Sequence, residues 1–143
     1  MQDHAAEHLT KRQCVLIVED DASINEMLQS VLAWEGYNVI TANSGQDALA
    51  RFAASTSTPP DHTTCDPIDL ILLDLQMPEM NGEDVIAQLQ QQGYNVPPIV
   101  VLSARREQAV EATAHAIGAS EFLLKPFQIN DLLESMQRAL RPA

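Results

Sequence analysis

Five short apolar runs alternate with segments of helical periodicity between residues 14 and 141, and this alternation restricts the fold more than any other feature. The first run, CVLIV, is continuous and rich in β-branched residues, which is typical of a strand buried on both faces. The predicted strands lie at 14–18, 37–42, 68–74, 97–104 and 121–125. The predicted helices lie at 22–36, 44–55, 82–93, 105–117 and 128–141. Such alternation predicts an α/β fold with a parallel sheet, right-handed crossovers and helices on both faces.

The length and composition indicate one globular domain. The chain has 143 residues, of which 45% are hydrophobic and 20% charged, enough to bury a core. Residues 1–12 are polar and predict a flexible extension, so the domain is placed at 13–143. The segment 55–67 is rich in Ser, Thr and Pro, which predicts a loop between the second helix and the third strand.

The charge and the cysteine content exclude several classes of protein. A formal net charge of −12 should repel nucleic acid and anionic membrane, and should attract cations and basic partner surfaces. Two cysteines, Cys14 and Cys65, do not make a disulfide scaffold and suit a reducing cytosol. The N-terminus carries no apolar segment of a signal peptide, and no run approaches the roughly 18 apolar residues of a membrane span. We therefore expect a cytoplasmic protein.

Polar side chains stand at the carboxyl ends of four predicted strands. They are Glu19, Asp20 and Asp21 after the first strand, Asp74 at the end of the third, Ser103 at the end of the fourth and Lys125 at the end of the fifth. The carboxyl ends of parallel strands meet at one edge of a sheet, where such folds place their functional site. Carboxylates crowded together repel each other and call for a cation, and an oxygen-only ligand set suits Mg²⁺.

This cluster suggests transfer of a phosphoryl group onto a carboxylate. An ionised Asp costs several kcal/mol to bury without partners, so Asp74 at the end of a buried strand needs a specific reason. Asp74 is the candidate nucleophile, with magnesium held by Asp20, Asp74 and the main-chain oxygen of Gln76. Lys125 would neutralise a carboxylate or hold an incoming anion, and Ser103 would donate a hydrogen bond to a phosphoryl oxygen.

Four motifs carry a resemblance to a known family. They are VLIVEDD (15–21), LLDLQMPEMNG (72–82), VVLSA (100–104) and GASEFLLKPF (118–127). With these motifs the chain resembles the response-regulator receiver domains of bacterial two-component signalling, such as the chemotaxis regulators, over roughly residues 14 to 141. The resemblance implies a doubly wound, flavodoxin-like (βα)5 fold with strand order 2-1-3-4-5. The loop at 55–67 is longer than the family's usual connection.

The resemblance also implies roles for individual residues. They are Asp74 as phosphoacceptor, Asp20 as direct magnesium ligand, Glu19 as a ligand through water, Gln76 as a main-chain ligand, Ser103 as the hydroxyl switch, Phe122 as the aromatic switch, Lys125 as the family's lysine, and Pro126 as the residue after a cis peptide bond.

The implied function is that of a phosphoacceptor switch in a phosphorelay. The phosphoryl group would come from a sensor histidine kinase or a histidine phosphotransfer protein, and the domain would assist its own phosphorylation and dephosphorylation without turning over a separate substrate. The output partner or dimer contact is expected on the face formed by helix 105–117, strand 121–125 and helix 128–141. Phe122 lacks the hydroxyl of a tyrosine, so any signal that needs that hydrogen bond is in doubt.

Two other classes of protein share some of these features. A phosphatase of the haloacid-dehalogenase type also uses an Asp nucleophile after a strand, but it needs a second acid two residues later, where this chain has Gln76. A flavodoxin-like cofactor binder would have a Ser-, Thr- and Gly-rich phosphate loop after the first strand, where this chain has the acidic EDDAS. Both features argue against these alternatives.

Overall fold

The computed structural model describes residues 12–55 and 68–141. The strands are β1 (Cys14–Val18), β2 (Asn38–Ala42), β3 (Leu70–Asp74), β4 (Ile99–Ser103) and β5 (Glu121–Leu124). The helices are α2 (Ala22–Trp34), α3 (Gly45–Ser55), α4 (Gly82–Gln91), α5 (Glu107–Ile117) and α6 (Ile129–Leu140). The strands pair in parallel in the order β2-β1-β3-β4-β5, so the predicted fold and strand order are confirmed.

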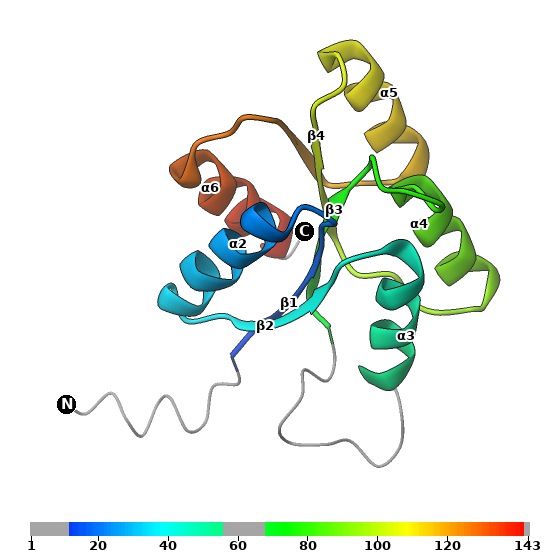
Figure 1. The fold of residues 1–143 in the computed structure, drawn as a ribbon, viewed down its shortest axis with the longest axis horizontal. Coiled ribbons are helices and arrows are strands. Elements are labelled where there is room, and N and C mark those ends of the chain that lie inside the picture. Colours follow the sequence, from blue (N-terminus) through cyan, green and yellow to red (C-terminus); the bar gives the residue numbers. More distant parts are fainter. Residues whose placement is uncertain (1–11, 56–67, 142–143) are drawn as a thin grey trace.

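The helices form a layer on each face of the sheet, with α2 and α6 on one side and α3, α4 and α5 on the other (Figure 1). Successive side chains of a strand point to opposite faces, and β1 divides its residues between two apolar clusters accordingly. Val15 and Ile17 pack in the cluster that includes Leu28 of α2, whereas Leu16 and Val18 pack in the cluster on the other face. This burial of both faces explains why the strands are continuous apolar runs.

Short polar side chains cap α2 and α4, two of the helices that begin at the functional edge. Asp21 is the N-cap of α2, and its side chain accepts a hydrogen bond from the backbone N–H of Ile24 at 3.1 Å. Asn81 caps α4 in the same way through the N–H of Asp84 at 3.0 Å. Asp21 is therefore a helix-start acid, and it separates α2 from the two acids that follow β1.

Some expectations differ from the structure or fall outside it. A single Trp on a helix is most simply expected in the core or at its rim, but Trp34 of α2 is 88% exposed. Cys14 is buried at the start of β1 and is disulfide-bonded. This differs from the expectation of a reducing cytosol, where disulfides are rare. The predictions for the extension at 1–12 and the loop at 55–67 lie almost entirely outside the described residues. Within the described ranges, no helix is long and apolar enough to cross a membrane.

Gly82 allows α4 to start against the end of β3. A Cβ atom at Gly82 would lie 2.7 Å from the carbonyl oxygen of Asp74, and a Cβ at Gly45 would instead meet the side chain of Met80 at 2.8 Å. We expect Gly82→Ala to cost about 1–3 kcal/mol of unfolding free energy, because backbone atoms must move to accept the methyl group. Gly45→Ala is the control and should cost less, because a half-buried side chain moves more easily than a strand. Urea unfolding of both variants decides this, and equal or reversed costs would contradict it.

Candidate functional site

The carboxyl ends of β1 and β3 bring three carboxylates together, as the sequence predicts. One ligand atom from each of Glu19, Asp20 and Asp74 lies within 4.8 Å of the other two. Glu19 and Asp74 are 1% and 2% exposed, whereas Asp20 is exposed. The strand register places Val18 of β1 beside Leu73 of β3, so both strands reach this edge at the same level.

Glu19 is fixed by contacts along its whole length. Its backbone N–H donates to the carbonyl oxygen of Ala42 at the end of β2 over 3.1 Å. Its carboxylate accepts at Oε1 from Lys125 Nζ over 2.8 Å and at Oε2 from the backbone N–H of Asp21 over 3.1 Å. Glu19 thus links the ends of β1, β2 and β5, and it holds the lysine beside the other carboxylates.

Asp74 shares the lysine with Glu19. Its Oδ1 lies 3.4 Å from Lys125 Nζ and accepts a hydrogen bond from the backbone N–H of Gln76 at 3.2 Å. Burial and the Glu19 carboxylate raise the pKa of Asp74 from the ordinary 3.8 to about 7, although Lys125 and the Gln76 N–H act to lower it. Burial opposes the charge on Lys125, but its contacts with Glu19 and Asp74 outweigh this effect and raise the pKa of the ammonium group.

These residues fit a hard divalent cation. All three side chains offer carboxylate oxygens, the ligand type that Mg²⁺ prefers, and the exposed Asp20 leaves room for water ligands. The raised pKa of Asp74 shows that one lysine does not fully compensate two buried carboxylates. A cation at this position would supply the missing positive charge.

Ser103 lies at the end of β4, the next strand after β3 in the sheet, and it is fully buried. Its carbonyl oxygen accepts from the backbone N–H of Lys125 at 2.8 Å, and its hydroxyl oxygen accepts from the backbone N–H of Arg105 at 3.1 Å. The Arg105 side chain in turn donates to Glu83 Oε2 at 3.0 Å, which ties the loop after β4 to the first turn of α4. The end of β4 and the loop after it are therefore connected to the end of β5 and to α4.

Two further predicted residues lie beside this cluster. Phe122 of β5 pairs in register with Val101 of β4, and its partly buried side chain packs against the apolar cluster on the α3, α4 and α5 face. The peptide bond between Lys125 and Pro126 is cis, as the resemblance implied.

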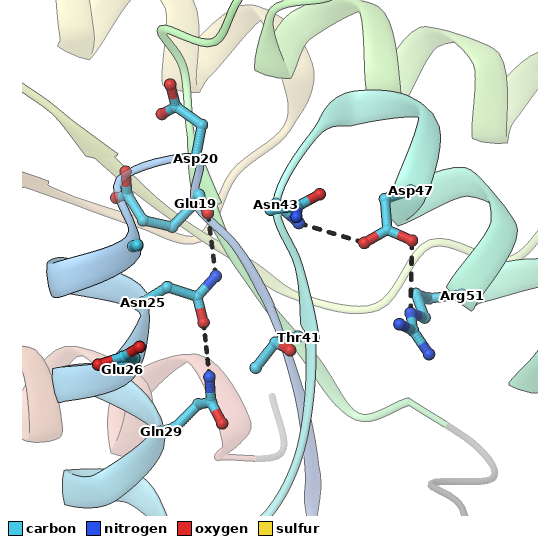
Figure 2. A pocket seen from close by; sticks show the side chains of 10 residues that line it. Glu19, Asp20, Asn25, Glu26, Gln29, Thr41, Asn43, Asp47 and Arg51 are labelled. Carbon is cyan, nitrogen blue, oxygen red and sulfur yellow. Dashed lines mark hydrogen bonds and ion pairs between the residues drawn. The ribbon is translucent and has the colours of Figure 1, made fainter.

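Sequence reasoning missed three polar residues that surround the site. Glu83 pairs with a residue 22 positions away, which no local pattern reveals. Asn25 and Gln29 of α2 join a hydrogen-bonded chain that reaches Glu19 (Figure 2). A signal for Asn25 existed: it lies three residues before Leu28 and seven before Leu32, on the helical stripe that is buried.

Proteins with similar sequences are bacterial regulators. A probable transcriptional regulatory protein of Picosynechococcus sp. is 37% identical over 133 residues, which cover 93% of this chain and 51% of that protein. The transcriptional regulatory protein CpxR of Escherichia coli is 33% identical over 127 residues, which cover 89% of this chain and 49% of CpxR. The chain thus spans about half the length of the curated relatives it matches.

Solved structures and a family match agree with this finding. The chemotaxis protein CheY4 of Vibrio cholerae has a TM-score of 0.74 at 33% identity, with 91% of this chain and 100% of that chain covered. The response regulator TrrA of Thermotoga maritima, solved in complex with Mg²⁺ and BeF, has a TM-score of 0.70 at 27% identity, with 90% of this chain and 99% of that chain covered. Residues 15–137 match the response regulator receiver domain. The chain belongs to this family.

The raised pKa of Asp74 predicts a pH dependence of stability without metal. The folded protein keeps a proton on Asp74 that the unfolded chain releases above the ordinary pKa of 3.8, so this group stabilises the fold at low pH. That contribution is lost as the pH rises from 3.8 through about 7. We expect wild type to lose about 1 kcal/mol or more relative to Asp74→Asn over this range, the equivalent of roughly one pKa unit.

Urea unfolding in the presence of a chelator, from about pH 4 to about pH 8, measures the difference in unfolding free energy between wild type and Asp74→Asn. Glu111→Gln is the control, because Glu111 is an exposed acid on α5, away from the strand ends. Its difference from wild type should stay flat. A flat difference between wild type and Asp74→Asn would contradict the role of Asp74 in this pH dependence.

Proposed function

We propose that this receiver domain is a phosphoacceptor switch and that Asp74 accepts the phosphoryl group from a sensor histidine kinase or a histidine phosphotransfer protein. The observation that carries the proposal is the cluster of Glu19, Asp20 and Asp74, with Lys125 in contact with two of its members. Asp20, Asp74 and the main-chain oxygen of Gln76 would hold Mg²⁺ directly, and Glu19 would hold it through water.

The reaction assigns a step to each of these residues. A carboxylate oxygen of Asp74 attacks phosphorus, the new O–P bond forms, and the N–P bond to the donor histidine breaks. When bound, the cation neutralises charge on the phosphoryl oxygens. Lys125 Nζ, which contacts Glu19 and Asp74, would also meet a phosphoryl oxygen, and the Ser103 hydroxyl would donate to another.

The same residues would assist both gain and loss of the phosphoryl group, so the domain turns over no substrate of its own. A haloacid-dehalogenase-type phosphatase would place its general acid where this chain has Gln76, whose amide carries no transferable proton near neutral pH. Membership of the receiver family favours the switch over this phosphatase and over a flavodoxin-like cofactor binder.

The partners follow from the family and the charge. The two relatives described above are about twice as long as this chain, and both are named as transcriptional regulatory proteins. We propose that this domain itself binds neither nucleic acid nor membrane, because its net charge is −12, and that it acts in the cytoplasm. Its output partner or dimer contact would use the face formed by α5, β5 and α6, with Arg106, Glu107, Phe122 and Gln128.

The first test of the proposal is phosphorylation. With Mg²⁺ and acetyl phosphate, or with beryllofluoride as a mimic, the protein should take up one group, measured by mass spectrometry or fluorine NMR. Asp74→Asn should abolish uptake because it removes the nucleophile, and Asp20→Asn should weaken Mg²⁺ binding because it removes a charged ligand. Glu111→Gln is the matched surface control and should behave as wild type. Stoichiometric labelling of Asp74→Asn would exclude Asp74 as the acceptor.

The second test concerns how phosphorylation is read. If Ser103 moves toward a phosphoryl oxygen, it vacates space behind β4 that the half-buried Phe122 side chain can fill. A phosphoryl group shifts this population only if it favours one position. We expect Phe122→Ala to accept the beryllofluoride mimic but to lose the response of the α5, β5 and α6 face, whereas the matched variant Phe122→Tyr keeps it because the ring still packs. Amide exchange over residues 103–128, with and without the mimic, measures this response. A silent face in a mimic-bound wild type would overturn the assignment.

A further inference from the structure

Asn25 is a buried polar residue on the otherwise apolar face of α2. Its side chain is 6% exposed and lies on the stripe that also buries Leu28 and Leu32. A buried amide costs free energy unless its hydrogen bonds are satisfied, so its partners define its purpose. Asn25 Nδ2 donates to the carbonyl oxygen of Glu19 at 2.9 Å and to that of Ala42 at 3.3 Å.

These two bonds fix the backbone from which the metal ligand projects. The carbonyl of Glu19 and the N–H of Asp20 belong to one planar peptide group. Asn25 holds the carbonyl side of that plane. The carbonyl oxygen of Ala42, at the end of β2, accepts both from Asn25 and from the N–H of Glu19 at 3.1 Å, so this segment is tied to β2. The direction in which Asp20 leaves β1 is therefore set partly by Asn25, since rotation of this plane would break the bond at 2.9 Å.

Gln29 reinforces the orientation in which the Asn25 amide faces the strands. An asparagine amide has a donor end and an acceptor end, and the two carbonyl oxygens, which only accept, favour its NH₂ end. Gln29 Nε2 donates to Asn25 Oδ1 at 2.9 Å, which leaves the NH₂ group to face Glu19 and Ala42. Figure 2 shows this chain running from Gln29 through Asn25 to Glu19, along one side of a polar pocket that Asp20 also lines.

We propose that Asn25, oriented by Gln29, is a positioning residue that sets the Mg²⁺ affinity of the acidic edge. The proposal rests on the proposed function, in which Asp20 and Asp74 hold the cation. Groups that orient metal ligands without touching the metal contribute about 10- to 100-fold to affinity. Asn25 acts on the ligand through the backbone, so its loss removes no carboxylate and changes only how the carboxylates are arranged.

The experiment is calorimetric titration of Mg²⁺ into the full chain and its variants. Asn25→Leu keeps the approximate size of the side chain but removes both donors, and it should weaken Mg²⁺ binding by about tenfold or more. Val31→Ala, on the same helix and packed against the same apolar cluster, is the structural control. It should lower the unfolding midpoint without changing the Mg²⁺ affinity, so a fall in stability alone cannot account for the result.

Gln29, at a half-buried position where a substitution should be tolerated, provides a second test. Here simple charge attraction and the positioning role predict opposite changes in Mg²⁺ affinity. Gln29→Glu adds a negative charge near the site, which by simple attraction would tighten cation binding. A carboxylate only accepts hydrogen bonds, so it would draw the Asn25 NH₂ toward itself and turn Oδ1 against the two carbonyls. We therefore expect Gln29→Glu to bind Mg²⁺ at least about threefold more weakly than wild type, and Gln29→Met to lie between them.

Two results would overturn the positioning role: a folded Asn25→Leu that binds Mg²⁺ within twofold of wild type, or a Gln29→Glu that binds it as tightly as wild type or more tightly. If Asn25→Leu does not fold, the Gln29 variants decide the question. Binding by the wild type distinguishes a failure of this inference from a failure of the proposed function. A wild type that binds neither Mg²⁺ nor beryllofluoride contradicts the proposed function, whereas a wild type that binds both beside unaffected variants contradicts only the positioning role.

Discussion

Two carboxylates, Glu19 and Asp74, are held almost out of water at one edge of the sheet, and a single ammonium group on Lys125 contacts both. The three groups come from the ends of β1, β3 and β5, and Nζ lies 2.8 Å from Glu19 and 3.4 Å from Asp74. One ammonium group thus faces two carboxyl groups. Burial and the Glu19 carboxylate raise the pKa of Asp74, and Lys125 offsets this only in part. This charge imbalance is costly for the fold, but it prepares the edge for a cation.

The rest of the fold holds these groups at fixed positions. A parallel sheet brings the carboxyl ends of its strands to one edge, and burial of both faces under helices keeps the strands rigid. Two loops at this edge are closed by short polar contacts, because Asp21 caps α2 and Asn81 caps α4. Gly82 in addition lets α4 approach the carbonyl of Asp74. The apolar clusters thus supply the stability that the crowded carboxylates remove.

The sequence predicted those features that depend on local pattern. Apolar runs and helical periodicity located every described strand and helix, and the rule for parallel sheets placed Glu19, Asp20 and Asp74 at a common edge. It did not predict the exposure of Trp34, because one aromatic residue fits either side of a helical stripe. Nor did it predict the pair of Arg105 and Glu83, whose contact depends on how the loop after β4 lies over α4.

The contacts of Ser103 explain how a change at the edge could reach the helices. A hydroxyl accepts and donates at once, and the oxygen of Ser103 accepts from the N–H of Arg105 while its hydrogen stays free to donate elsewhere. Donation to a phosphoryl oxygen would therefore not require this bond to break, and the loop at Arg105 would move with Ser103. The ion pair between Arg105 and Glu83 connects that loop to α4, and α5 begins two residues later at Glu107. A small displacement of one buried hydroxyl would thus act on two helices, because a hydrogen bond and an ion pair connect the loop to Ser103 and to α4.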